Sequence, residues 1–188
     1  MKFDSQKRHR RSIRLKGYDY TQPGAYFVTL VTYDRVPLFG EIVNGEMQLN
    51  PLGEIARAEW FQTAVIRPYV VLHPDEFVAM PNHVHGIIWI VDDTVGAQRR
   101  CAPTDRAVGG ATPTNVIPGS LGAIVRSFKS ATTKRINVLR GASGDSIWQR
   151  NYYEHIIRSE RALNAIRRYI LNNPAKWTKD AEYLEMTP

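Results

Sequence analysis

The sequence predicts one α+β domain, in which an antiparallel sheet carries helices on one face and a further helix follows at the C-terminus. Short runs rich in β-branched and aromatic residues alternate with longer segments in which apolar residues recur at helical spacing. The predicted order is β-α-β-β-α-β-α, and its first six elements form the split βαβ, or ferredoxin-like, arrangement. A length of 188 residues suits one domain with its own core.

The first half of the chain supplies a strand, a hairpin and a helix. Residues 25–35, AYFVTLVTYDR, have the composition of a strand. The Asn-Gly pair at 44–45 is a turn signal for a small hairpin. Asn50 followed by Pro51 marks a helix start, because asparagine caps a helix and proline fits its first turn. We expect this helix to end near Pro68.

Two further strands and a long loop are expected next. Residues 70–82, VVLHPDEFVAMPN, predict the second strand, and the third begins at His83. Residues 92–119 lose all periodicity and are filled with Gly, Thr, Pro and Ala, which predicts a long mobile loop.

The remaining elements are a helix, a strand and a final helix. Ser120 is expected to cap a helix whose core face runs as far as Leu139. Residues 146–158 predict the fourth strand. Ser159 is expected to cap the last helix, which should end at Asn173 because the residue before a proline resists the helical conformation.

The chain is basic, with a formal net charge of +7, and the charge is unevenly distributed. We expect residues 1–20 to form a flexible basic arm, residues 21–178 the domain, and residues 179–188 a tail. No acidic residue occurs from Arg106 to Gly144, although six basic residues do. Such clustering is typical of proteins that bind a phosphate backbone, and it also fits a merely solubilising surface.

Composition excludes several other classes. No segment approaches the ~20 consecutive apolar residues that a membrane helix needs, so we expect no membrane partner. The basic N-terminal residues have no apolar segment behind them and do not resemble a secretory signal. The lone Cys101 excludes a disulfide framework and a multi-cysteine metal site. Together these features favour a cytoplasmic protein.

His83 and His85 are the first candidate site residues. Side chains alternate between the faces of a strand, so the two histidines should point the same way, with Val84 on the opposite face. Two neutral imidazoles side by side are natural ligands for a divalent metal. The pair alone fits half-exposed strand histidines equally well.

Tyr169 and Asn173 lie four residues apart on the final helix and therefore share one of its faces. A phenol and a carboxamide in this arrangement could both reach a metal held by the two histidines. Nitrogen and oxygen ligands of this kind suit Mg²⁺ or Mn²⁺ and leave coordination positions for a phosphate oxygen. The alternative is a tyrosine at the edge of the core and an asparagine that caps its own helix.

These residues carry a resemblance to a known family. His83-Val84-His85 matches the His-hydrophobic-His motif of the HUH single-strand nucleases, and MPNHVHGIIWI resembles its form in single-tyrosine transposases. WQRNYYEHIIRSE followed by YILNNPAKW is similar to the REP-associated tyrosine transposases, relatives of small insertion-sequence transposases. The resemblance extends from about Tyr18 to Trp177. The loop at 92–119 is longer than that family's pattern.

The resemblance implies a ferredoxin-like fold and a site. It implies His83 and His85 as metal ligands, Tyr169 as the nucleophile, and Asn173 in the place of the third ligand, where more distant relatives have glutamine. Tyr152 and Tyr153 are competing candidates for the nucleophile. His155 also matches a family position, where it would support a metal ligand or contact DNA. The alternative is a core histidine.

The implied activity is metal-dependent cleavage and rejoining of single-stranded or hairpin DNA, such as REP-like palindromes, through a 5′-phosphotyrosine intermediate. The implied assembly is a monomer or a homodimer. Basic residues of the arm and of the helix after Ser120 are candidates for backbone contacts: Arg8, Arg10, Arg11, Arg126, Lys129 and Arg140. A non-catalytic nucleic-acid-binding domain is the main alternative, because Tyr26, Phe27 and Tyr33 on the first strand could stack bases. A structural metalloprotein is a further alternative, which the net charge disfavours.

Overall fold

The computed structural model describes residue 15, residues 17–92 and residues 116–179. The predicted arm at 1–20, the loop at 92–119 and the tail at 179–188 therefore lie largely outside the described residues.

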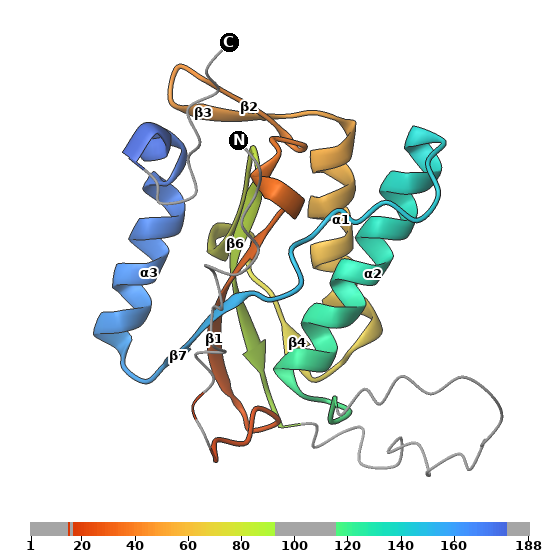
Figure 1. The fold of residues 1–188 in the computed structure, drawn as a ribbon. Helices are drawn as coiled ribbons and strands as arrows, with labels where there is room; N and C mark the ends of the chain where they lie inside the picture. The colour runs from red at the N-terminus through yellow and green to blue at the C-terminus, as the bar shows by residue number, and fades with distance from the viewer. Residues whose placement is uncertain (1–14, 16, 93–115, 180–188) are drawn as a thin grey trace, which may run out of the picture.

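The fold is the predicted α+β arrangement built on an antiparallel sheet (Figure 1). Its strands are β1 (Gly24–Val31), β4 (Val70–Val71), β5 (Phe77–Met80), β6 (His83–Ile90) and β7 (Tyr153–Ile157). The strand order is β4-β6-β1-β7, with β5 also paired to β6. All these pairs are antiparallel, and the two central strands are β1 and β6. The ferredoxin-like prediction is confirmed.

Three predicted strands are shorter than expected. The first ends at Val31, before the 3₁₀ turn η1 (Tyr33–Arg35). The second is interrupted by the 3₁₀ turn η2 (Pro74–Glu76), so that β4 and β5 pair separately with β6. Pro74 explains the break, because it has no N–H to donate to a ladder. Before β7, the fourth predicted strand makes only an isolated antiparallel bridge, between Trp148 and Thr32, and continuous pairing with β1 is confined to β7. Ile147 and Trp148 are buried in the core.

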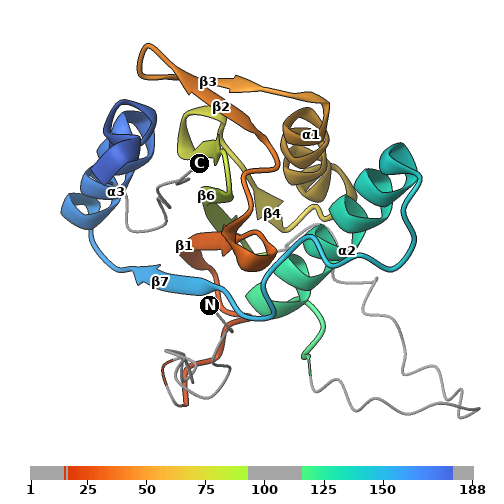
Figure 2. The same ribbon diagram turned by 45° about the horizontal axis from the view of Figure 1, so that its top comes forward.

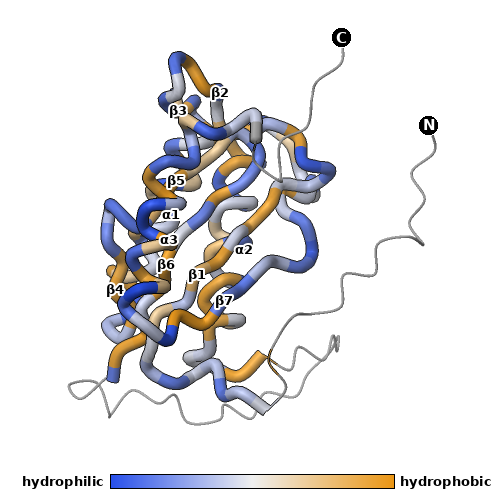
Figure 3. The backbone as a smooth tube through the Cα atoms, turned by 90° about the vertical axis from the view of Figure 1, so that its left-hand side faces the viewer, coloured by the Kyte–Doolittle hydropathy of each residue, from blue (hydrophilic) through white to orange (hydrophobic). Residues whose placement is uncertain are grey.

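Three helices cover the two faces of the sheet. Helices α1 (Pro51–Ile66) and α2 (Leu121–Arg140) pack together on one face, and α3 (Glu160–Asn172) lies on the other (Figures 1 and 2). Figure 3 views the molecule from the α3 side, with α3 in front of the sheet. Among the described residues, none of these helices combines the length and hydropathy that crossing a bilayer requires.

The helix ends follow local sequence signals. The Asn50 side chain accepts hydrogen bonds from the N–H groups of Leu52 and Gly53, at 2.9 and 3.0 Å. Ser120 and Ser159 cap α2 and α3 in the same manner, so all three predicted caps are confirmed. The predicted core position of Leu139 is wrong: its side chain is 57% exposed, because the last turn of α2 extends past the core.

The predicted hairpin consists of β2 (Gly40–Val43) and β3 (Glu46–Leu49). Asn44 and Gly45 both have positive φ, 53° and 82°, as a type I′ turn requires. The hairpin reaches from α1 toward η3 (Pro174–Lys179), the 3₁₀ turn that follows α3 (Figure 1).

Side-chain alternation along β1 and β6 creates two cores. Tyr26, Val28 and Leu30 pack toward α1 and α2, whereas Ala25 and Phe27 pack toward α3 with Ile87 and Ile170. Burying both faces explains why the central strands read as nearly continuous apolar runs. The residues that face α3 therefore lie between the sheet and one amphipathic helix.

Replacing Gly86 with alanine is expected to destabilise the fold by about 1–3 kcal/mol, the usual cost of overpacking a core. A Cβ at this position would lie 2.3 Å from Cζ2 of Trp60. Urea denaturation followed by tryptophan fluorescence measures the loss. In a Trp60→Phe background the same substitution should cost less, because the smaller side chain lacks the outer indole ring that carries Cζ2. An equal cost in both backgrounds would contradict this packing.

Candidate active site

The two histidines of β6 lie on the sheet face that α3 covers. Alternation from His83 puts His85 on the same side and Val84 in the opposite core, as predicted. Both imidazoles are buried, with exposed fractions of 0% and 2%. The interpretation of the pair as half-exposed strand histidines is therefore wrong.

The imidazoles converge through their Nε2 atoms, which lie 2.9 Å apart. Each Nδ1 has an oxygen partner at 2.8 Å: Oδ1 of Asn82 for His83, and Oγ1 of Thr29 for His85. Thr29 is directly opposite His85 in the β1–β6 register, which explains its position. Ligand histidines in metal sites are oriented by such partners on the second ring nitrogen.

These contacts constrain where the protons lie. A carbonyl oxygen only accepts, so Nδ1 of His83 carries the proton and its Nε2 presents a lone pair toward His85. The Thr29 hydroxyl can either donate to Nδ1 of His85 or accept from it. In the first case Nε2 of His85 donates to His83. In the second, both lone pairs face the same point, the arrangement that suits a bound cation.

The electrostatic environment favours neutral imidazole at His85. Burial, followed in size by the nearby His83, holds the pKa of His85 well below its usual value. The neutral ring is also the form that binds a metal. Burial and the neighbouring His83 ring thus both favour the protonation state of His85 that a metal site requires.

Tyr169 reaches the histidine pair from α3. Its hydroxyl oxygen lies 3.1 Å from Nε2 of His85, and the two ring centroids are 5.0 Å apart. Phe27 packs edge-on against the Tyr169 ring at 6.0 Å. The side chain remains 45% exposed, while its neighbour Ile170 is buried. The structure thus joins the predicted phenol to the predicted imidazoles, although 84 positions separate Tyr169 from His85.

Asn173 follows Tyr169 by one helical turn, at the C-cap of α3, and is 2% exposed. Four residues later, the Trp177 ring lies 5.8 Å from the ring of His83. Because the residues one turn before and four positions after Asn173 both contact the histidines, this part of the chain runs along the pair. Sequence reasoning did not single out Trp177, which was visible only as an aromatic residue after a helix end.

The two histidines can hold a divalent ion if a further ligand comes from a residue other than His, Cys, Asp or Glu. Within the described ranges, no group of three or more His, Cys, Asp or Glu residues could hold a metal. The His83 and His85 nitrogens nevertheless have a suitable separation, 2.9 Å. Two nitrogens at right angles on one ion, with bonds of about 2.1 Å, would be about 3 Å apart. An amide oxygen such as that of Asn173 is an acceptable further ligand for a hard ion.

A buried ion pair fixes α3 to the sheet beside this site. Glu76 in η2 is fully buried, and its Oε1 accepts from Nε and Nη2 of Arg167 at 2.8 and 2.5 Å. Its Oε2 accepts from Nε1 of Trp89 at 2.6 Å. Arg167 precedes Tyr169 by two residues, so this contact sets the position of the helix segment that carries the phenol. No local pattern in the sequence indicates this ion pair.

The competing tyrosines lie apart from the histidine nitrogens. Tyr152 packs against the core on the α1–α2 side, beneath the Lys129 ammonium at 5.7 Å. Tyr153 is on the α3 side and contacts Phe27 at 6.2 Å. His155 is exposed on the same face, so its interpretation as a core histidine is wrong.

The predicted DNA contacts on α2 lie across the sheet from the histidines. Arg126 and Arg140 are exposed there. The Lys129 ammonium instead donates to the carbonyls of Gln149 and Asn151, at 2.8 and 3.1 Å. Burial lowers the pKa of Lys129 to about 8. These three residues remain predicted contacts, although α2 does not adjoin the site. Arg8, Arg10 and Arg11 fall outside the described residues.

Two of the three aromatic residues that the base-stacking alternative requires are buried and cannot contact a base. Tyr26 and Phe27 are buried beneath helices, and the Tyr26 hydroxyl donates to the carbonyl of Gln22 at 2.7 Å. Tyr33 is exposed beyond the end of β1. The first strand therefore presents no aromatic surface of the kind that this alternative needs.

Comparison with known proteins finds a relative in sequence and a solved structure with the same fold. No family model matches the chain. A protein of Haemophilus influenzae, described as uncharacterized, is 40% identical over 184 residues, which cover 98% of each chain. The chain belongs to the family of that protein. A solved structure of a REP-associated tyrosine transposase bound to a REP hairpin shares the fold, with a TM-score of 0.56 and 18% identity, over 88% of this chain and 74% of that one.

Proposed function

We propose that this protein is a transposase-type nuclease and strand transferase, which cleaves and rejoins single-stranded or hairpin DNA. The observation that carries the proposal is the contact between the Tyr169 hydroxyl and Nε2 of His85, 3.1 Å apart, beside the second histidine. A phenol held against two convergent, buried imidazoles suits nucleophilic attack at a metal-bound phosphate.

In this proposal Tyr169 is the nucleophile. Its oxygen attacks the scissile phosphorus, its proton passes to solvent, and the bond from phosphorus to the 3′-oxygen breaks. The departing 3′-oxygen takes up a proton from solvent. One strand end then carries a 3′-hydroxyl, and the other is joined through its 5′-phosphate to Tyr169. Attack by a 3′-hydroxyl on the same phosphorus reverses the step and releases the tyrosine. The phosphodiester is therefore exchanged without another energy source.

His83 and His85, with Asn173 as the third ligand, would hold a divalent ion, Mg²⁺ or Mn²⁺, that polarises the phosphate and offsets its developing charge. The phenol of an ordinary tyrosine ionises only near a pH of about 10, so attack near neutrality needs such a charge nearby. Thr29 and Asn82 orient the imidazoles through their Nδ1 atoms. Phe27 supports the Tyr169 ring from the sheet side.

The shared fold with a transposase bound to a REP hairpin supports hairpin DNA as the substrate class. The net charge of +7 supports an anionic partner. Chemistry on one strand requires that strand to be unpaired, which a palindrome with a single-stranded extension provides. A monomer is sufficient for the proposed site, because one chain brings Tyr169 into contact with His85, and His85 into contact with His83.

A denaturing gel tests the covalent step. The protein is incubated with Mn²⁺ and a hairpin oligonucleotide from beside its own gene, labelled at the 5′ end or at the 3′ end. We expect only the 3′ label to migrate with the protein, because the attached fragment retains that end. Tyr169→Phe should abolish the band, while Tyr153→Phe should retain it. A hairpin that binds on a native gel but never forms an adduct would favour the non-catalytic nucleic-acid-binding alternative.

A further inference from the structure

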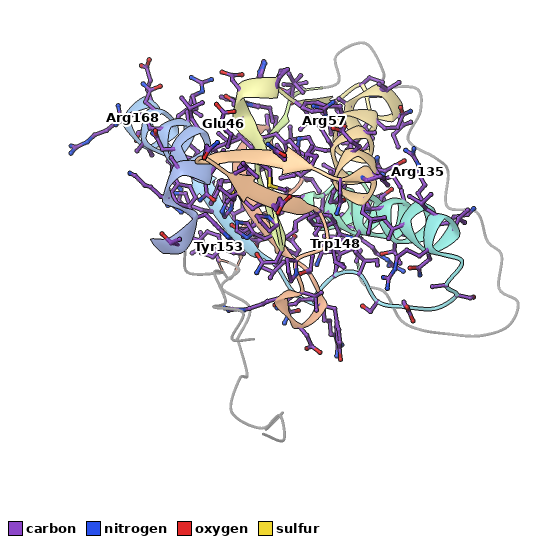
Figure 4. The ribbon with its side chains drawn as sticks, turned by 90° about the horizontal axis from the view of Figure 1, so that it is seen from above. Glu46, Arg57, Arg135, Trp148, Tyr153 and Arg168 are labelled. Atoms are coloured by element: carbon purple, nitrogen blue, oxygen red, sulfur yellow. The ribbon has the colours of Figure 1, made fainter. Side chains whose placement is uncertain are left out.

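Tyr153 lies in the same cross-sheet row as the histidine site. It is the first residue of the edge strand β7 and pairs with Thr29 of β1, which in turn pairs with His85 of β6. Directly paired residues share a face of the sheet, so all three side chains face the α3 side. Figure 4 labels Tyr153 on the side of the molecule where α3 lies. Two strand spacings separate Tyr153 from His85, or about 10 Å.

The Tyr153 ring is exposed but supported from beneath. Its side chain is 42% exposed, and it packs edge-on against the buried ring of Phe27, with centroids 6.2 Å apart. Phe27 also stacks on His85 at 5.5 Å and meets Tyr169 edge-on at 6.0 Å. Phe27 thus links the exposed ring to both parts of the candidate site. A ring held in this way can accept a stacking partner with little further loss of conformational freedom.

The elements around Tyr153 are strongly basic. From Arg150 to Lys176 the chain holds six basic residues and two acidic ones. Arg158, Arg161 and Arg168 are exposed there, whereas the acidic Glu154 is buried on the other face of β7. An exposed aromatic ring among cations is the combination with which proteins bind single-stranded nucleic acid, where the ring stacks on a base and the cations attract the backbone.

We propose that Tyr153 is a stacking platform for a nucleobase close to the scissile phosphate, and that it therefore positions the substrate strand. This inference rests on the proposed function, because it takes the phosphate to lie at the histidine pair. Because Tyr153 is about 10 Å, or two strand spacings, from His85, the stacked base must belong to a nucleotide close to that phosphate. Tyr153 is then a binding residue in the same site in which Tyr169 reacts.

Abasic scanning tests this assignment. Hairpin oligonucleotides from beside the protein's own gene carry one abasic site, which is moved stepwise along the single-stranded extension. Affinity is measured by fluorescence anisotropy with Tyr169→Phe protein, so that cleavage does not interfere. We expect one abasic position to weaken binding about tenfold, the size of one lost base–aromatic stack. In protein that also carries Tyr153→Leu, binding should already be weak, and the same abasic site should cost nothing more.

Tyr153→Phe is the matched control, because it keeps the ring and removes only the hydroxyl. It should behave like the parent protein at every position. Penalties that simply add in Tyr153→Leu protein, or a Phe variant that behaves like the Leu variant, would overturn the stacking assignment. An adduct on the denaturing gel without this coupling would sink the inference and leave the proposed function standing. Coupling without any adduct would overturn the proposed function and, with it, the placement beside a scissile phosphate, and Tyr153 would then stack a base in a non-catalytic DNA-binding domain.

Discussion

Replacing His83 with alanine is expected to abolish divalent-metal binding and strand cleavage. The substitution leaves one imidazole where two Nε2 atoms now lie 2.9 Å apart, and a single nitrogen holds a hard divalent ion weakly in competition with water. Because loss of an outer-sphere partner alone costs about 10–100-fold in metal affinity, loss of a ligand should cost more than about 100-fold. Calorimetric titration with Mn²⁺ measures the affinity, and adduct formation measures the cleavage.

His73→Ala is the control for that experiment. His73 is an exposed histidine whose ring centroid lies 6.3 Å from that of Trp89. It is not among the hydrogen-bond partners of His83 and His85 described above. Its replacement should leave both metal affinity and adduct yield within experimental error of the parent protein. Unchanged Mn²⁺ affinity in His83→Ala protein would show that the metal binds elsewhere, and the proposed ligand set would have to be abandoned.

Arg167→Met is expected to slow cleavage far more than it weakens DNA binding. The substitution leaves the buried Glu76 carboxylate with Trp89 but without its cation, and removes two hydrogen bonds that fix α3. The expected loss of stability is about 3 kcal/mol, at the low end for a broken buried pair, because the arginine is partly exposed. Displacement of the Tyr169 segment by about 1 Å would cost about 100-fold in rate.

A matched ion pair on the other side of the molecule provides the control. Arg135 of α2 bonds to Glu59 of α1 at 2.6 Å, and it is more exposed than Arg167. Arg135→Met should cost about 1 kcal/mol or less in unfolding free energy and should leave the rate of adduct formation unchanged. Comparable rates for the two variants, at temperatures where both are folded, would mean that the Glu76 contact does not position the nucleophile.

The sequence predicted those parts of the fold that depend on local signals. Asn50, Ser120 and Ser159 cap helices because each side chain satisfies N–H groups within three residues of itself. Strand alternation was enough to place His83 and His85 on one face. The position of Tyr169 beside Ile170 followed from helical periodicity.

The features that could not be predicted from the sequence depend on contacts between residues far apart in the chain. Glu76 and Arg167 are 91 positions apart, and neither periodicity nor composition could pair them. Helical periodicity predicted the core face of α2 except at Leu139, but periodicity contains no information about which side of the sheet the helix will cover. The Lys129 ammonium is turned inward because two carbonyls of a distant segment lie within its reach.

The most direct test of the central claim is to identify the residue that carries the DNA. After reaction with Mn²⁺ and a hairpin, the adduct is trimmed with nuclease, digested with trypsin and analysed by mass spectrometry. Cleavage after Arg168 and Lys176 isolates Tyr169 as the one tyrosine in its peptide, whereas Tyr152 and Tyr153 fall together in the peptide 151–158. We predict a 5′-phosphonucleotide on the Tyr169 peptide. Its appearance on the 151–158 peptide would contradict the proposed nucleophile.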